Sequence, residues 1–196
     1  MRIIGVTGGV GAGKSTVLQY MEEAWGARLI LADHVSHELM EPGSGMCRRI
    51  QETFGGEVRS RDGGIDRKRL GDLVFADEQK RVQLNGIVHP SVKEEILRRI
   101  GQAETTGKGC VVVEAALFLE EKYDAFCSET WYIYTNEDRR RARLKVSRGY
   151  TDERIDQMFQ SQKSHEEFLG RCDYVIDNNG TAEETCRQID RRMMNR

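Results

Sequence analysis

The stretch Gly8-Gly9-Val10-Gly11-Ala12-Gly13-Lys14-Ser15 (GGVGAGKS, residues 8–15) directly follows the apolar run at residues 3–6. It fits the pattern of a phosphate-binding loop, which needs Gly, four free positions, Gly, Lys and then Ser or Thr. Glycines let the backbone turn tightly and approach an anion, and a following helix adds free N–H donors and a positive dipole end. The stretch therefore predicts a strand, a loop that holds a polyphosphate, and a helix that begins near Lys14.

The side chains at the end of this loop have separate expected roles. Lys14 would reach the β- and γ-phosphates, the Ser15 hydroxyl would bind Mg²⁺, and Thr16 would serve the α-phosphate side. A glycine-rich turn without a ligand is the alternative, but such a turn has no use for Lys and Ser at the first helical positions. The residues expected to bind the nucleotide here are Gly8, Gly11, Ala12, Gly13, Lys14, Ser15 and Thr16.

Size and composition narrow the class of protein. A chain of 196 residues is long enough for one α/β domain but not for two full domains. With 30 basic and 32 acidic side chains, its net charge of −2 does not indicate a nucleic-acid or membrane-surface protein. Five widely spaced cysteines without a C-x-x-C pair favour reduced thiols over a zinc site. The first strand begins right after Met1, and no apolar run is of bilayer length, so we expect a soluble cytoplasmic protein.

Short β-branched runs alternate with helical patterns along the chain. Leu18, Met21 and Trp25 form an apolar stripe at helical spacing, and Gly26 can end that helix. Alternation of strand and helix predicts a doubly wound, five-stranded parallel sheet with right-handed crossovers. The expected strands are residues 2–6, 28–31, 110–114, 130–134 and 173–176.

Two stretches are longer than a minimal sheet of this kind needs. Residues 33–107 are mostly helical by pattern, with a loop or small hairpin around Asp62-Gly63-Gly64 and a Pro90 that should start or bend a helix. We expect a substrate-binding insertion there. Residues 137–170 are rich in Arg and then in Gln, which suits a helical lid. The single domain 1–196 would then consist of a nucleotide-binding core (1–32, 108–136 and 171–196), the insertion and the lid.

The loop alone would fit GTPases, motor ATPases and small-molecule kinases. A GTPase should also carry an Asn-Lys-x-Asp motif, which the sequence lacks. The size and the Arg-rich lid favour a kinase that acts on a small acceptor. A kinase for a nucleoside or nucleotide and a nucleotide-dependent regulator without transfer activity remain as alternatives.

Over essentially its whole length, the sequence resembles the dephospho-coenzyme A kinase family. The segments that carry the resemblance, in order, are IGVTGGVGAGKST (4–16), LAD (31–33), MEPG (40–43), DR with Leu70 (66–70), VF (74–75), LN-x-x-x-HP (84–90), SQ (161–162) and VIDNNG (175–180). The resemblance implies a P-loop NTPase fold. It also implies phosphorylation of the ribose 3′-hydroxyl of dephospho-CoA by ATP with Mg²⁺, giving CoA and ADP in the last step of CoA biosynthesis.

The same resemblance implies small-molecule partners only, ATP and dephospho-CoA, in a monomer or weak homo-oligomer without nucleic acid or membrane. Two segments depart from the family pattern. Leu31 stands where the family has the first Asp of Asp-Ala-Asp, so only Asp33 can carry that motif's role. In residues 114–120, Glu114 replaces the family's Asp and Ala116 its Pro, which changes where the carboxylate sits.

Two carboxylates are candidates for the chemistry. Asp33 follows the second strand at the edge where doubly wound sheets bind ligands, so we assign it to the acceptor hydroxyl as general base or orienting group. Its alternative role is a helix N-cap. Glu114 ends the third strand and would hold Mg²⁺ or its waters; its alternative is an ordinary strand terminus.

The remaining candidates come from the lid, the insertion and the segment after the last strand. Arg143 and Arg148 would close over the phosphates, while the other lid arginines form a solvated face. Asn178 and Gly180 would line the adenine site, or simply form a turn. His34 and His37 are expected on a helix surface rather than at a metal. The acceptor residues implied by the resemblance, besides Asp33, are Thr7, Arg67, His89 and Leu117, with a structural role as the alternative for His89.

Overall fold

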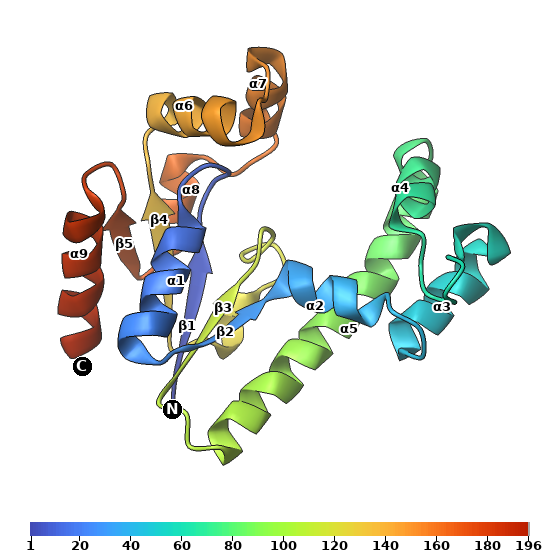
Figure 1. Cartoon of the computed structure of the whole chain (residues 1–196), viewed down its shortest axis with the longest axis horizontal. Helices are drawn as coiled ribbons and strands as arrows, with labels where there is room; N and C mark the ends of the chain where they lie inside the picture. The colour runs from blue at the N-terminus through green and yellow to red at the C-terminus, as the bar shows by residue number, and fades with distance from the viewer. Residues whose placement is uncertain (196) are drawn as a thin grey trace. The chain divides into compact units, whose positions relative to one another are not determined.

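The computed structural model describes residues 1–195 and contains one five-stranded parallel sheet in the order β2-β3-β1-β4-β5 (Figure 1). Central β1 pairs in parallel with β3 and β4, and β4 pairs in parallel with β5. The strands are β1 (Arg2–Thr7), β2 (Arg28–Leu31), β3 (Cys110–Glu114), β4 (Glu129–Tyr134) and β5 (Tyr174–Asp177). The doubly wound α/β prediction is confirmed, with every strand boundary within one residue of its predicted place.

Helices connect the strands. They are α1 (Lys14–Trp25), α2 (Ala32–Leu39), α3 (Gly45–Phe54), α4 (Arg67–Phe75), α5 (Glu78–Thr105), α6 (Glu137–Arg148), α7 (Asp152–Gln160), α8 (His165–Leu169) and α9 (Ala182–Met194), with 3₁₀ turns η1 (Gly56–Val58) and η2 (Tyr123–Phe126). None of the helices within residues 1–195 combines the length and the apolar character that crossing a membrane requires.

The chain divides into two compact units. The first unit comprises Met1–Leu29 and the chain from Ala103 onward, and the second comprises Ile30–Gln102. In the first unit, strand residues such as Ile4, Val112 and Ile133 are fully buried, as expected for a parallel sheet covered on both faces. Helix α1 ends at Gly26, as predicted, in the left-handed conformation. Figure 1 shows α6 and α7 beyond the end of the sheet where β1 finishes.

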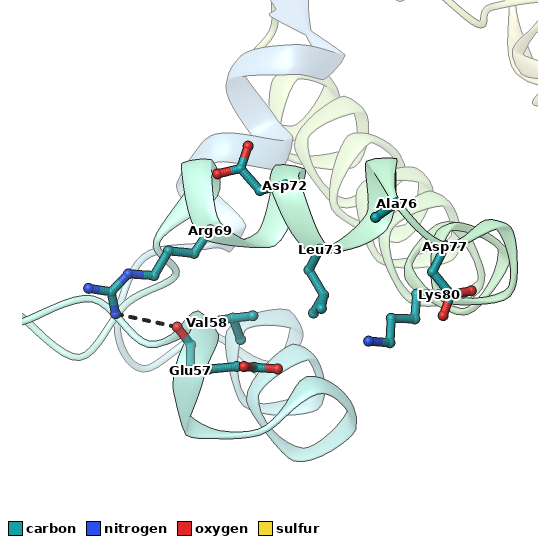
Figure 2. Close-up of a pocket in the computed structure, with 8 residues that line it drawn as sticks. All are labelled: Glu57, Val58, Arg69, Asp72, Leu73, Ala76, Asp77 and Lys80. Carbon is teal, nitrogen blue, oxygen red and sulfur yellow. Dashed lines mark hydrogen bonds between the residues drawn. The ribbon is translucent and has the colours of Figure 1, made fainter.

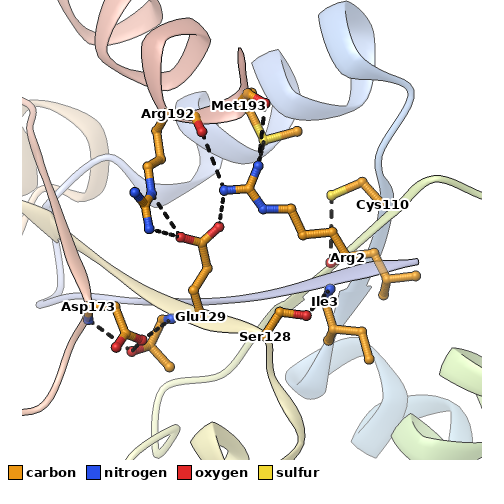
Figure 3. Close-up of polar contacts among 10 residues, drawn as sticks. Arg2, Ile3, Cys110, Ser128, Glu129, Asp173, Arg192 and Met193 are labelled. Atoms are coloured by element: carbon orange, nitrogen blue, oxygen red, sulfur yellow. Dashed lines mark hydrogen bonds and ion pairs between the residues drawn. The ribbon is translucent and has the colours of Figure 1, made fainter. Parts of the chain in front are cut away.

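A buried carboxylate joins the sheet to the last helix of the first unit (Figure 3). Glu129 begins β4, is 7% exposed, and forms ion pairs with Arg2 of β1 and with Arg192 of α9. Helix α9 is also joined to α1, because Tyr20 and Trp25 of α1 both donate hydrogen bonds of 2.9 Å to Asp190 of α9. These contacts fix β1, α1 and α9 relative to one another, and with them the loop between β1 and α1.

The second unit has its own apolar core. Its buried residues include Met46, Ile50, Val58, Leu70 and Ile87, which come from α3, η1, α4 and α5. The predicted turn around residues 62–64 is present, closed by an antiparallel bridge between Arg59 and Ile65.

Pro90 does not start a helix, so that alternative of the prediction is wrong. It lies inside α5, which continues for 28 residues. A proline costs the helix one backbone hydrogen bond. The buried residues Ile87, Val92, Ile96 and Ile100 hold the helix on both sides of it, and tertiary packing overrides the local preference.

Candidate phosphate-binding site

The loop between β1 and α1 has the backbone that an anion site requires. Gly13 is the N-cap of α1 in the left-handed region, at φ 87°, and a Cβ there would collide with the Asn178 amide. At Gly8, a Cβ would lie 2.6 Å from the Ile133 carbonyl oxygen. No side chain caps α1 and no acidic residue stands in its first turn. The N–H groups and positive dipole end of α1 are therefore available to a phosphate.

Lys14 lies back across this loop. Its ammonium donates a hydrogen bond of 2.9 Å to the Gly8 carbonyl and stands 3.5 Å from a carboxylate oxygen of Glu114. Glu114 ends β3 in register with Val6, at the strand end that leads into the loop. The side chains of Lys14 and Glu114 are only 19% and 15% exposed. A partly buried cation and carboxylate thus meet at the carboxyl edge of the sheet, where parallel α/β sheets bind ligands.

The carbonyl oxygen of Ala12 accepts three hydrogen bonds from behind the loop. Thr135 Oγ1 donates at 2.9 Å, Asn178 Nδ2 at 2.8 Å and Arg143 Nη1 at 3.2 Å. The other side of the Asn178 amide accepts from Thr185, and Asn178 is buried. The side chain expected at the adenine therefore holds the loop from beneath. Gly180, two residues further on, is exposed and precedes α9.

Two arginines of the predicted lid, which look alike in the sequence, have different surroundings. The Arg143 guanidinium donates hydrogen bonds to three uncharged oxygens: the Ala12 carbonyl, Thr135 Oγ1 and, at 3.0 Å, the Asn178 carbonyl. It thus places a positive charge against the loop without a carboxylate to neutralise it. Arg148 is exposed at the C-terminal end of α6.

Sequence reasoning missed Arg140 and Gln162, which hold the middle of the loop. Arg140 Nε donates to the Val10 carbonyl at 2.8 Å and its Nη2 donates to Gln162 Oε1 at 2.7 Å. The same Gln162 oxygen accepts from the Val10 N–H at 3.1 Å. Arg140 also stacks on Phe159, at 4.2 Å from the ring centroid, and burial lowers its pKa because a low-dielectric site disfavours the charge. One feature of the sequence could have indicated that Arg140 faces the protein: Arg140 and Arg143 share a helix face with Leu144, which is buried.

A pocket of about 370 Å³ opens beside these two residues in the first unit. Its walls carry the rings of Tyr132, Tyr134, Phe159 and His165. Tyr134 and His165 have ring centroids 4.4 Å apart, and burial raises the pKa of Tyr132 to about 12. The remaining lining residues are Thr135, Asn136, Glu137, Arg140, Gln162, Lys163, Ser164 and Glu167.

The other predicted site residues of the first unit lie at the same edge of the sheet. Ser15 and Thr16 are exposed in the first turn of α1, and Thr7 is buried at the end of β1. Leu117, in the segment after β3, is 47% exposed although its neighbour Phe118 is fully buried.

Three predicted acceptor residues belong to the second unit. Asp33 is exposed in the first turn of α2, but Leu31 occupies the N-cap position, so the capping alternative for Asp33 is wrong. Arg67 is exposed at the start of α4, whose N-cap is Asp66, and His89 is half-buried in α5. His34 and His37 are exposed on α2, as predicted.

A second pocket, of about 520 Å³, lies within the second unit among η1, α4 and the start of α5 (Figure 2). Arg69 there donates to the Glu57 carbonyl at 3.4 Å, and Asp77 caps α5 through the N–H groups of Gln79 and Lys80. Three carboxylates face two cations, and none of the residues expected for phosphate chemistry lines it. The pocket lining is Glu57, Val58, Arg69, Asp72, Leu73, Ala76, Asp77 and Lys80.

Comparison with known proteins adds independent information. The family model described as dephospho-CoA kinase matches residues 2–184. A dephospho-CoA kinase of Symbiobacterium thermophilum is 37% identical over 190 residues, which is 97% of this chain and 79% of that protein. A crystal structure from Thermus thermophilus superposes with a TM-score of 0.82 at 25% identity, covering 98% of this chain and 96% of that one. Shikimate kinase from Acinetobacter baumannii, with a TM-score of 0.58 at 16% identity over 99% of this chain and 93% of its own, shares the fold.

Proposed function

The chain belongs to the dephospho-CoA kinase family, and from that membership we propose that it transfers the γ-phosphoryl group of MgATP to the ribose 3′-hydroxyl of dephospho-CoA. As a member of this family it is a kinase that converts dephospho-CoA to CoA in CoA biosynthesis. The observation that carries the proposal is the uncapped α1 terminus with the Lys14 ammonium lying over the loop. Phosphoryl transfer depends on such positioning and charge neutralisation more than on covalent catalysis.

The loop and Lys14 hold the donor in this proposal. The backbone N–H groups of Gly13, Lys14 and Ser15 bind the polyphosphate, and Lys14 exchanges its contact with the Gly8 carbonyl for the β- and γ-phosphates. The uncompensated charge of Arg143, fixed against Ala12, adds positive potential at the loop. Arg148, which is exposed, is the residue we propose to close over the phosphates from α6.

The residues at this edge fit Mg²⁺. Magnesium takes hard oxygen ligands and is usually held by one or two carboxylates together with substrate phosphates. The Ser15 hydroxyl and the Glu114 carboxylate, which lies near Lys14, would supply such oxygens, Glu114 either directly or through a bound water. When bound, Mg²⁺ neutralises charge on the β- and γ-phosphates.

We propose that the acceptor is bound by the insertion, residues 33–107, and by residues of the nucleotide-binding core. Asp33, exposed and without a capping role, orients the 3′-hydroxyl and accepts its proton. Arg67 and His89 in the second unit, and Thr7 and Leu117 in the first, are the further residues we propose to bind the acceptor, and residues 137–170 act as the lid. Asn178 and Gly180 stay assigned to the adenine side of the donor, where Asn178 acts by holding Ala12.

We further propose a cytoplasmic monomer or weak homo-oligomer. All five cysteines are free, and burial raises the pKa of Cys110 and Cys172 to about 11 and that of Cys127 to about 12. Thiols of this kind are unreactive, which suits a reducing compartment.

A coupled assay of ADP release over a panel of acceptors tests the proposal. Dephospho-CoA should stimulate ADP release, and nucleosides, nucleotides and shikimate should not. Single-turnover transfer of labelled γ-phosphate to dephospho-CoA separates an enzyme from a nucleotide-dependent regulator. Activity on another acceptor with none on dephospho-CoA, or ATP binding without transfer, would overturn it.

A further inference from the structure

We propose that the ring-lined pocket between β4, α6 and α8 receives the adenine ring of the phosphoryl acceptor, a role that rests on the proposed function. This pocket, lined by Tyr132, Tyr134, Phe159 and His165, is not needed to explain how the loop holds phosphate. Its volume of about 370 Å³ lies within the range of small-molecule sites.

The first argument is the direction of the loop. Lys14, which reaches the terminal phosphates, rests on Gly8, whereas the first turn of α1 takes the α-phosphate side. The donor's terminal phosphate therefore lies at the Gly8–Val10 half of the loop, and its nucleoside leaves from the half that Asn178 holds.

The second argument is that the pocket adjoins the terminal-phosphate half. Arg140 and Gln162 line the pocket and together bind both backbone polar groups of Val10. These two side chains therefore connect the pocket directly to the loop. The acceptor approaches the terminal phosphate from the side opposite to the donor's nucleoside, because attack is in line with the leaving group.

The third argument is charge. Glu137 and Glu167 line the pocket, and Lys163 is already shared between Glu120 and Glu167, at 3.4 and 3.7 Å. The positive charge of Arg140 faces Val10, Gln162 and the Phe159 ring. Both cations of the lining are thus engaged with protein groups and balanced by two carboxylates, which makes the pocket a poor site for a diphosphate, whereas its aromatic walls can stack a neutral ring.

Two fragments of the acceptor test this assignment at saturating ATP. Adenosine 5′-monophosphate, which carries the base, should inhibit wild-type enzyme competitively with dephospho-CoA. In Tyr134→Leu, that inhibition should weaken and the KM for dephospho-CoA should rise about tenfold, the loss expected from one stacking ring. Inhibition by 4′-phosphopantetheine, kcat and the KM for ATP should stay within about twofold of wild type, since stacking contributes to base binding alone. Tyr134→Phe should restore the acceptor KM.

Tyr150→Leu is the matched control, because Tyr150 lies in the same part of the chain but outside the pocket. Three results for Tyr134→Leu would overturn the assignment. A rise in the KM for ATP would show that the pocket binds the donor, and weaker inhibition by 4′-phosphopantetheine would show that it binds the phosphopantetheine part of the acceptor. Unchanged kinetics would show that it binds neither substrate. Should Tyr134→Leu fail to fold, His165→Gln carries the same test. Wild-type enzyme that ignores dephospho-CoA would contradict the proposed function instead.

Discussion

The side-chain oxygen of Gln162 lies 3.1 Å from the backbone nitrogen of Val10, although 152 residues separate the two in the sequence. The same oxygen accepts from Arg140 at 2.7 Å. One amide therefore ties the segment between α7 and α8 to α6 and to the phosphate-binding loop.

Replacing Gln162 by Leu should destabilise the protein and weaken ATP binding. Both donors lose their acceptor, and because they are partly buried each loss should cost up to the roughly 1–3 kcal/mol of a fully buried unsatisfied donor. Urea unfolding and calorimetric titration with MgATP measure the two effects. Gln160→Leu, at the exposed end of α7, is the control and should leave both values near wild type. Equal behaviour of the two variants would show that the contact does not hold the loop.

Lys14→Ala should lower kcat/KM for ATP by about 100-fold or more, the size of effect seen when a preorganised electrostatic group is removed. The change removes the charge that faces the phosphates and leaves Glu114 without the cation 3.5 Å from it. Steady-state kinetics measure the loss. Lys108→Ala, an exposed lysine before β3, should retain full activity. Turnover of the Lys14 variant within a few-fold of wild type would contradict the assigned role.

Asp33→Asn should reduce kcat by about 100-fold or more while leaving the affinity for ATP unchanged, because a general base acts on the acceptor's proton only. The fold should tolerate the change, since Asp33 is exposed and does not cap α2. Kinetics combined with ATP titration separate the two quantities, and His34→Gln is the neighbouring exposed control. Near-normal turnover of the variant would remove the catalytic role.

Glu95 makes part of the stability of the second unit depend on pH. Its hydrogen bond from Arg98, supported by Arg99, lowers the pKa of Glu95 from 4.5 to about 2. The unfolded chain thus binds this proton more readily, so the stabilisation is present above pH 4.5 and is lost as the pH falls toward 2. Glu95→Gln should therefore cost more free energy of unfolding at about pH 6 than at about pH 3. Exposed Glu94→Gln is the control; an equal cost at both pH values would contradict the assignment.

The strands and the loop could be predicted because their signals are local. Runs such as Val111-Val112-Val113 indicate a strand that is buried on both faces. The spacing of Gly8, Gly13 and Lys14 indicates the backbone conformation of a phosphate-binding loop. Whether a helix begins at Pro90 or continues through it could not be decided from the sequence, because apolar packing on both sides of the proline determines the outcome.

The candidate site could be predicted only in part from the sequence, for a related reason. Arg140 and Arg143 belong to a run of arginines whose members differ only in what the fold brings to them. Arg140 contacts Val10 and Gln162, while Arg141, the next residue of α6, pairs with Asp152 and Asp156 on α7. The sequence marked this arginine-rich segment as a candidate lid, and the contacts with distant segments distinguished its residues.

The three donors on the Ala12 carbonyl have a consequence for the peptide unit that follows. In a planar trans peptide the N–H points away from the C=O, so anchoring the oxygen of Ala12 aims the Gly13 N–H in the opposite direction. Thr135, Asn178 and Arg143 therefore orient a donor that they never touch. The peptide plane is set before the nucleotide arrives, which spares ATP the entropy of ordering it on binding.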